Sequence, residues 1–428
     1  MSEVRTTTLD NGITVVTETM PHLHSTALGL WVRSGSRAEH EGEHGIAHLL
    51  EHMAFKGTET RSARDIAEEI EAVGGDLNAV TSFEATAYYA RVLEDDVDLG
   101  LDLLGDITLN ARFDPTELQR EQHVIEQEIL NAHDTPDDLV FDQLQELSFP
   151  DQTLGRSILG SPESVRAFRP SDLKLFQERT YTSDRMVLSV AGAVDHDRVV
   201  DYATRVFQDT RVTPFDEIPR AAFSGGYRGI ARKIEQVHLT LGFQGCPYHD
   251  QGVFAAQILA TVLGGGMSSR LFQEVREKRG LCYGVYSYHW SVSDAGMFGI
   301  YAATGPSDVN DLLTVVFDEL AGVGQTVTEQ EVGRAKAQLK AGLLMSLESP
   351  SARIEQMARH LAVHGRIVPT SEIVERIDAV TAEDVMVIAN SLFREKACAI
   401  AAVGPKAGLK AVEKFARNQP VPRDLVDA

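Results

Sequence analysis

The sequence predicts an α+β protein of two duplicated, structurally similar domains, each a largely antiparallel sheet packed by helices. Three observations support this prediction. With 428 residues, the chain is longer than one ordinary core requires. Strand-like and helical patterns alternate along it, as in proteins whose helices cover a sheet. The order of these patterns in the first half recurs in the second at an offset of about 209 to 214 residues, too long for a solenoid repeat of roughly 20–50 residues.

Each predicted element has a counterpart in the other half. In the first half the elements are a strand (26–35), a histidine-rich helix (around 44–55), a strand (84–93), a helix (95–108) and a long helix (114–136). In the second half they are a strand (236–245), a helix (253–266), a strand (295–304), a helix (308–320) and a long helix (328–350). Each long helix runs into a Thr-Pro or Ser-Pro turn. The repeat is therefore a duplicated domain.

A segment with two prolines and a Gly-Gly pair, residues 209–229, separates the two copies. This composition is typical of a linker. We therefore expect a first domain at 1–208, a linker at 209–230 and a second domain at 231–428.

The composition excludes several classes of partner. Forty Lys and Arg against 63 Asp and Glu give a formal net charge of −23. Nucleic acids and anionic membranes bind through phosphates that Lys and Arg neutralise, so neither is an expected partner. Cationic ligands, including basic peptides, are compatible with this charge.

No apolar run approaches the roughly 18 residues that a membrane helix needs. The start of the chain, MSEVRTTTLDNG, lacks the pattern of a secretory signal, so we expect a cytoplasmic protein. The three cysteines form no CxxC pair, which argues against a disulfide framework or a thiolate zinc site. They are Cys246, Cys282 and Cys398.

Histidine recurs at every fourth position in HEGEHGIAHLLEH, at His40, His44, His48 and His52. Gly42 and Gly45 are poor interior helix residues, so we expect the helix to start between them. His40 then lies in the preceding loop. We expect His44, at the helix start, to be a hydrogen-bonding neighbour.

Two of these histidines have the spacing of metal ligands. A 3.6-residue period buries one side of the helix, formed by Ile46, Leu49, Leu50, Met53 and Ala54. His48 and His52 project together from successive turns on the other side, roughly 5–6 Å apart at Cβ. Two imidazoles at this spacing can share one tetrahedral ion. Glu51 points into the same space.

An alternative is that this is the ordinary solvated face of an amphipathic helix. The second copy bears on this alternative. Aligning HLLEHMAFKGT (48–58) with QILATVLGGGM (257–267) places Gln257, Ala260 and Thr261 opposite His48, Glu51 and His52. The helical pattern persists there without these side chains, so packing alone does not require them.

The long helix of the first half carries two carboxylates on its apolar stripe. Its predicted start is an N-cap box of Asp114 and Glu117, with Pro115 at the first helical position. The apolar stripe consists of Leu118, Ile125 and Ile129. Glu121 and Glu128 lie on the same stripe, seven residues apart. A carboxylate facing a core is costly unless it is paired or binds a metal, although either could simply cap the edge of the stripe.

These motifs together resemble a known family. His48-Leu-Leu-Glu51-His52, followed 76 residues later by Glu128, is similar to the inverted motif of the pitrilysin-type zinc peptidases, or inverzincins. The resemblance is strongest to single-length members similar to the mitochondrial processing peptidase, and it covers essentially the whole chain. The stretches that carry it, in the family's order, are GIAHLLEHMAFKGT, GGDLNAVTSFEATAYY, EQHVIEQEI and GGGMSSRLFQEVREKRGLCYGVYS.

The resemblance implies a role for each of five residues in the first half. His48, His52 and Glu128 would bind Zn²⁺. Glu51 would be the catalytic base that activates the hydrolytic water. Glu121 would be an accessory carboxylate that orients a ligand histidine.

The resemblance also implies substrate-binding residues. Asn78 and Ala79 match an edge strand that pairs with an extended peptide. Arg276 and Tyr283 match an Arg-x6-Tyr pair that closes over the substrate from the second, non-metal domain and can stabilise the oxyanion. The first domain would then be catalytic and the second would contribute substrate-binding residues.

The implied function is a zinc-dependent endopeptidase that hydrolyses peptides or unfolded, extended polypeptide segments. Family members of this length carry two of the four repeats of longer relatives, so the chain would form half of a clamshell. A homodimer is expected, with a heterodimer of related chains as the other arrangement. A non-catalytic subunit is the alternative function, but such members usually lose a ligand or the base. A structural zinc site is disfavoured because no cysteine lies near either helix in the sequence.

Overall fold

The computed structural model of the chain describes residues 3–393 and 397–418. Its contacts divide the chain into two compact units. Unit 1 comprises residues 1–130, 157–219 and 344–368. Unit 2 comprises residues 131–156, 220–343 and 369–428. Each unit therefore contains a segment from the other half of the chain.

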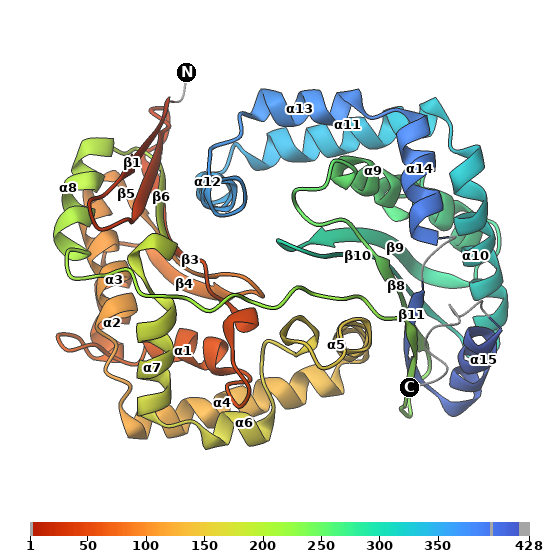
Figure 1. The fold of residues 1–428 in the computed structure, drawn as a ribbon, viewed down its shortest axis with the longest axis horizontal. Coiled ribbons are helices and arrows are strands. Elements are labelled where there is room, and N and C mark those ends of the chain that lie inside the picture. Colours follow the sequence, from red (N-terminus) through yellow and green to blue (C-terminus); the bar gives the residue numbers. More distant parts are fainter. Residues whose placement is uncertain (1–2, 394–396, 419–428) are drawn as a thin grey trace. The chain divides into compact units, whose positions relative to one another are not determined.

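Unit 1 is built on a sheet whose strands β3 and β4 are labelled in Figure 1. The sheet has six strands in the order β1-β2-β6-β3-β5-β4. The strands are β1 (Glu3–Thr8), β2 (Thr14–Thr19), β3 (Ser25–Val32), β4 (Asp76–Thr81), β5 (Thr86–Leu93) and β6 (Met186–Gly192). Only the pairing of β2 with β6 is parallel. The prediction of a largely antiparallel sheet is confirmed for this unit.

Unit 2 repeats this arrangement in a five-stranded sheet of order β7-β11-β8-β10-β9. The strands are β7 (Gly226–Ala231), β8 (Val237–Gln244), β9 (Cys282–Ser291), β10 (Gly296–Thr304) and β11 (Cys398–Gly404). Only β7 and β11 pair in parallel. Strands β6, β3, β5 and β4 of unit 1 correspond in order to β11, β8, β10 and β9, which confirms the duplication.

Helices cover both sheets. Those of unit 1 are α1 (Ile46–Ala54), α2 (Ala63–Ala72), α3 (Val97–Leu109), α6 (Pro162–Ala167), α7 (Pro170–Thr180), α8 (His196–Val206) and α12 (Pro350–His364). Those of unit 2 are α5 (Pro136–Ser148), α9 (Val253–Gly264), α10 (Val309–Thr326), α13 (Thr370–Ala379), α14 (Ala382–Phe393) and α15 (Lys406–Arg417). The unit boundaries fall inside α4 (Pro115–Asp134) and α11 (Glu329–Ser346).

Every predicted strand and helix has an observed counterpart. Most ends agree within a few residues, but α10 continues from its predicted end at 320 to Thr326. Strand β7 begins at Gly226 and takes up the end of the segment predicted as linker. None of the described helices is long and apolar enough to cross a membrane.

The sheet of unit 1 buries both of its faces. Leu28, Leu30 and Leu188 point into the main core with α1, α3 and α4. Ala27 and Val187, on the alternate positions of the same strands, point to the opposite face. Because successive side chains of a strand alternate between faces, this second apolar face needs its own cover.

Helix α12, from the second half of the chain, covers that second face. It packs on β2, β3 and β6, and the side chains that it buries there are Ile354, Met357 and Ala358. In unit 2, the equivalent cover is α5 from the first half, which packs on β7, β8 and β11. Both helices start at a proline that follows Thr135 or Ser349. The two copies thus exchange equivalent helices.

A buried ion pair fastens α12 to unit 1. The Arg353 guanidinium donates through Nε and Nη2 to the Glu18 carboxylate, and the side chains are 10% and 5% exposed. Arg353 also donates to the Gln356 side chain. A charge buried to this degree requires its partner, because solvent cannot replace it.

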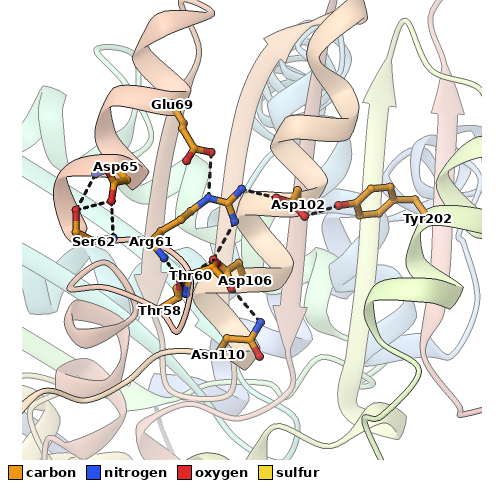
Figure 2. A network of polar contacts seen from close by, with 10 residues as sticks. All are labelled: Thr58, Thr60, Arg61, Ser62, Asp65, Glu69, Asp102, Asp106, Asn110 and Tyr202. Carbon is orange, nitrogen blue, oxygen red and sulfur yellow. Dashed lines mark hydrogen bonds and ion pairs between the residues drawn. The ribbon is translucent and has the colours of Figure 1, made fainter.

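A polar network holds the loop between α1 and α2 (Figure 2). Arg61 in this loop donates to Asp102 and Asp106 on α3 and to Glu69 on α2, at 2.5, 2.9 and 3.0 Å. Thr58 donates to the same Asp106 oxygen at 2.7 Å. Burial favours the neutral form of Asp106, but the hydrogen bonds from Thr58, Asn110 and Arg61 hold the pKa of this carboxyl below its usual value. These contacts therefore fix the end of the loop that leads into α2.

We expect Arg353→Met to lower the free energy of unfolding by about 3–5 kcal/mol, because Glu18 would remain as an unpaired buried charge. The measurement is a urea titration of each variant. The double variant Glu18→Met/Arg353→Met should recover part of the loss. A single variant that loses less than about 1 kcal/mol would show that the pair does not fasten α12.

The buried His360 of α12 predicts a loss of stability in acid. Its Nδ1 accepts a hydrogen bond from the Val368 backbone N–H at 3.3 Å. Burial, together with the charges of Arg359, His364 and Arg353, lowers the pKa of His360 to about 4. Between pH 6.5 and 4 the unfolded chain therefore binds a proton that the folded chain does not, so stability falls as the pH falls.

We expect the titration of His360 to lower the free energy of unfolding by up to about 3 kcal/mol between pH 7 and pH 4. Urea titrations at several pH values should show that the free energy of unfolding depends less steeply on pH in His360→Asn than in the wild type. Equal slopes in the two proteins would mean that His360 is not the group responsible.

Candidate metal centre

Helix α1 carries the two histidines with metal-ligand spacing. It begins at Ile46, after Gly45, and not between Gly42 and Gly45 as predicted. The reason is the backbone of Gly45, whose φ of +90° is left-handed. Its Cα also lies against Gly160, where a Cβ would come within 2.7 Å of the Gly160 Cα. The predicted buried side is confirmed, and Ala47 joins it.

The other two histidines lie outside the helix. His44 precedes it, and its Nε2 lies 2.8 Å from the carbonyl oxygen of Ser157, a hydrogen bond that ties the start of α1 to a distant loop. His40 lies in the preceding loop with its side chain half exposed. Neither belongs to the His, Cys, Asp and Glu group that could hold a metal.

Helix α4 supplies the carboxylates. As predicted, it starts at Pro115, and the Asp114 side chain accepts hydrogen bonds from the backbone N–H groups of Thr116 and Glu117 at 2.8 and 3.2 Å. The Glu117 side chain pairs with Arg120 instead of completing the predicted N-cap box. Glu121 is buried on the same side as Leu118, Ile125 and Ile129. Glu128 lies two turns further on, and its side chain is 39% exposed.

Three donor atoms converge between these helices. The Glu128 Oε2 lies 3.7 Å from His48 Nε2 and 3.8 Å from His52 Nε2. One ligand atom from each of the three residues lies within 4.8 Å of the others, and no other such group occurs in residues 3–393 and 397–418. Tetrahedral zinc with bonds of roughly 2.0–2.1 Å requires donors about 3.4 Å apart. The two separations measured from Glu128 Oε2 need to close by only a few tenths of an ångström.

The protonation state of His48 is also compatible with metal binding. Burial, followed by the charge of His52, lowers the pKa of His48 to about 4. The imidazole is therefore neutral near pH 7 and has a lone pair to donate. The buried His48 Nδ1 has no hydrogen-bond partner among the described residues.

His52 is oriented by Glu121. Its Nδ1 lies 3.0 Å from Glu121 Oε2 and donates to it, which leaves Nε2 facing Glu128. Burial opposes a charge on His52, but the hydrogen bond to Glu121 and the nearby Glu128 raise the pKa of His52. The other oxygen of Glu121, Oε1, lies 2.8 Å from Lys56 Nζ. Glu121 is thus a bridge between a lysine and a candidate ligand.

Glu51 lies beside the three donors and is held by a strand. Its Oε2 accepts a hydrogen bond from the Thr81 hydroxyl at 2.5 Å, at the end of β4. Burial raises the pKa of Glu51, and the bond from Thr81 partly opposes this rise. Thr81 thus holds the Glu51 carboxylate in place beside the three donors. A raised pKa suits a general base.

The structure brings five of the predicted site residues together in unit 1: His48, Glu51, His52, Glu121 and Glu128. Asn78 and Ala79 lie nearby on β4, the last strand of the sheet, against which α1 packs. Arg276 and Tyr283 lie in unit 2, where the Arg276 guanidinium lies 4.8 Å from the centre of the Tyr283 ring. Tyr283 is 81% exposed.

Sequence reasoning did not single out two contacts of this site, those of Thr81 and Lys56. Both residues lie inside the stretches that carry the family resemblance, GGDLNAVTSFEATAYY and GIAHLLEHMAFKGT. Their position in those stretches was the available signal. That position did not indicate that the Thr81 side chain contacts Glu51 or that the Lys56 side chain contacts Glu121.

Comparison with known proteins shows which family the chain resembles. The family profile described as insulinase (peptidase family M16) matches residues 14–162, and the profile described as peptidase M16 inactive domain matches residues 167–339. A protein of Rickettsia felis named uncharacterized zinc protease is 42% identical over 386 residues, which cover 90% of this chain and 94% of the relative. The Bacillus subtilis protein named uncharacterized zinc protease YmxG is 37% identical and covers 94% of this chain and 98% of its own length.

Solved structures share the fold. A crystal structure of a protease from Helicobacter pylori has a TM-score of 0.86 and 21% sequence identity, and the match covers 94% of this chain and 100% of that chain. A Pseudomonas fluorescens structure described as a peptidase M16 inactive domain has a TM-score of 0.88 and 22% identity. At these identities the likeness is one of fold.

The fold and the donor set are typical of an HxxEH metallopeptidase. With the relatives at 37–42% identity over nearly the whole chain, the family is established: the chain is a peptidase of family M16, the insulinase or pitrilysin family. The resemblance found in the sequence is confirmed.

We expect Thr81→Val to lower kcat/KM for peptide cleavage by roughly 10- to 150-fold, because a hydrogen bond to a charged group contributes about 1.5–3 kcal/mol. Thr81→Ser keeps the hydroxyl and should retain most of the activity. The loss should fall on kcat, with the metal content unchanged. If Thr81→Ser is as impaired as Thr81→Val, the effect comes from packing of β4 and not from the bond to Glu51.

Proposed function

We propose that the chain is an active zinc endopeptidase that hydrolyses peptides or extended polypeptide segments. His48, His52 and Glu128 would bind the zinc, and Glu51 would act as the base. The observation that carries this proposal is the convergence of the three donor atoms beside a held Glu51. At the equivalent helix α9, which carries Gln257, Ala260 and Thr261, this set is absent. The names of the relatives, zinc proteases, agree with the choice of metal.

The donor set determines what the site can do. Two histidines and one carboxylate leave a coordination position open, as in catalytic zinc sites. Bound zinc would polarise the scissile carbonyl and lower the pKa of a coordinated water. Glu51 would accept a proton from the attacking water and return it to the leaving amine. Glu121, by accepting the Nδ1–H of His52, would keep that ring in its binding orientation.

Strand β4 supports an extended substrate. It pairs with β5 along one edge and is the last strand in the order of the sheet. A peptide that adds to its open edge would form main-chain hydrogen bonds near Asn78 and Ala79. The same strand ends at Thr81, so the substrate and the base would share one support.

The second half would complete the site. We propose that residues 1–208 form the catalytic domain, 209–230 a linker and 231–428 a related domain without a metal. Arg276 and Tyr283 of that domain would contact the substrate and stabilise the oxyanion. The exposed ring of Tyr283, with the Arg276 guanidinium against it, is compatible with this role.

A non-catalytic subunit is the alternative function. The presence of all three ligands and of the base favours the catalytic function. A homodimer, a heterodimer with a related chain and a cytoplasmic location stay predictions.

The test combines zinc content with cleavage of a quenched, arginine-containing peptide. We expect wild-type protein and Glu51→Gln to contain equal zinc, and only the wild type to cleave, with a loss of at least roughly 100-fold in the variant. Removing zinc from the wild type with a chelator should abolish cleavage, and added Zn²⁺ should restore it. Full zinc without cleavage by the wild type would contradict the proposal and support the alternative of a non-catalytic subunit.

A further inference from the structure

Lys56 contacts the candidate metal centre without being part of its donor set. It follows the end of α1, and its Nζ lies 2.8 Å from Glu121 Oε1. The two oxygens of Glu121 thus have different partners, since Oε2 accepts from His52. A continuous chain of polar contacts therefore runs from Lys56 through Glu121 to His52.

This ion pair differs from an ordinary surface pair. The Glu121 side chain is only 7% exposed, whereas that of Lys56 is 30% exposed. Solvent cannot easily replace the ammonium group at a carboxylate that is buried to this degree. Loss of the lysine would leave one oxygen of Glu121 without its charged partner. Exposed pairs, by contrast, contribute little.

The main chain of Lys56 is fixed at both ends of its loop. On one side its N–H donates to the carbonyl of Met53 in the last turn of α1, at 3.2 Å. On the other side Thr58 forms a backbone bridge with Ala111, and Arg61 is held by α2 and α3 (Figure 2). The lysine therefore reaches Glu121 from a fixed position.

The contact between Lys56 and Glu121 lies within a group of carboxylates. Three carboxylates, Glu51, Glu121 and Glu128, lie close to the two histidines. Of these three carboxylates, Glu121 is the one that the ammonium group of Lys56 contacts, at 2.8 Å. The lysine thus holds Glu121 directed at His52 through the carboxylate oxygen that does not face the histidine.

We propose that Lys56 is a positioning residue of the metal centre, which acts on the metal through Glu121. By holding Oε1 it fixes the carboxylate whose Oε2 orients His52. This inference rests on the proposed zinc site and adds to it a residue outside the coordination sphere.

The test measures zinc affinity by competition with a chromophoric chelator, independently of peptide cleavage. We expect Lys56→Met to weaken zinc binding by roughly 10- to 100-fold, as mutations of groups that support metal ligands do. Lys56→Arg, which restores the charge, should recover most of the affinity. The Co²⁺-substituted proteins should show a changed visible spectrum in Lys56→Met and not in Lys56→Arg.

Lys340→Met is the matched control. Lys340 is also 30% exposed and pairs with a carboxylate, Asp378, at 2.6 Å in unit 2. The zinc affinity of the Lys340→Met variant should equal that of the wild type. An equal loss in both methionine variants would overturn the proposal, because it would show a general effect of charge removal.

A double-mutant cycle tests the route through Glu121. In a Glu121→Gln background, Lys56→Met should cause little further loss of affinity, since the residue through which it acts is already changed. Additive losses would overturn the proposal. If the wild type itself does not bind zinc tightly, the proposed function fails. If the wild type binds zinc and Lys56→Met is unchanged, only the role of Lys56 fails.

Discussion

Each sheet of this protein has two apolar faces, and covering both of them is the constraint on which the rest of the structure depends. In unit 1, one face packs on helices of the same half, while the other, with Ala27 and Val187, packs on α12. In unit 2, α5 from the first half has the equivalent place. Neither half of the sequence therefore contains all of the helices that its own sheet requires.

The packed sheet of unit 1 fixes the side chains of the candidate metal centre in place. Helices α1 and α4 bury their apolar sides in one core, which sets the spacing between His48, His52 and Glu128. Glu121 lies on the buried side of α4, where a carboxylate is tolerated only because His52 and Lys56 pair with it. The same contacts that satisfy this buried charge orient His52, a candidate metal ligand.

The two copies show how one scaffold separates packing from chemistry. The apolar patterns of α1 and α9 both serve a core, and both sheets have equivalent strand orders. Polar side chains with metal-binding geometry occur in the described part of the first copy alone. This division agrees with the description of the second matched family profile as an inactive domain.

The sequence by itself determined the elements and the duplication, through the period and order of its apolar patterns. Helix periodicity also placed His48, Glu51 and His52 on one side of a single helix, whereas the family and the roles of Glu121 and Glu128 followed from the resemblance. The sequence also indicated the cap of α4 at Asp114. Only the tertiary structure decided the exchange of α5 and α12, the burial of Arg353 against Glu18, and the contacts of Thr81 with Glu51 and of Lys56 with Glu121. Most of these contacts join residues far apart in the chain, and all of them depend on how the elements pack, which local periodicity does not encode.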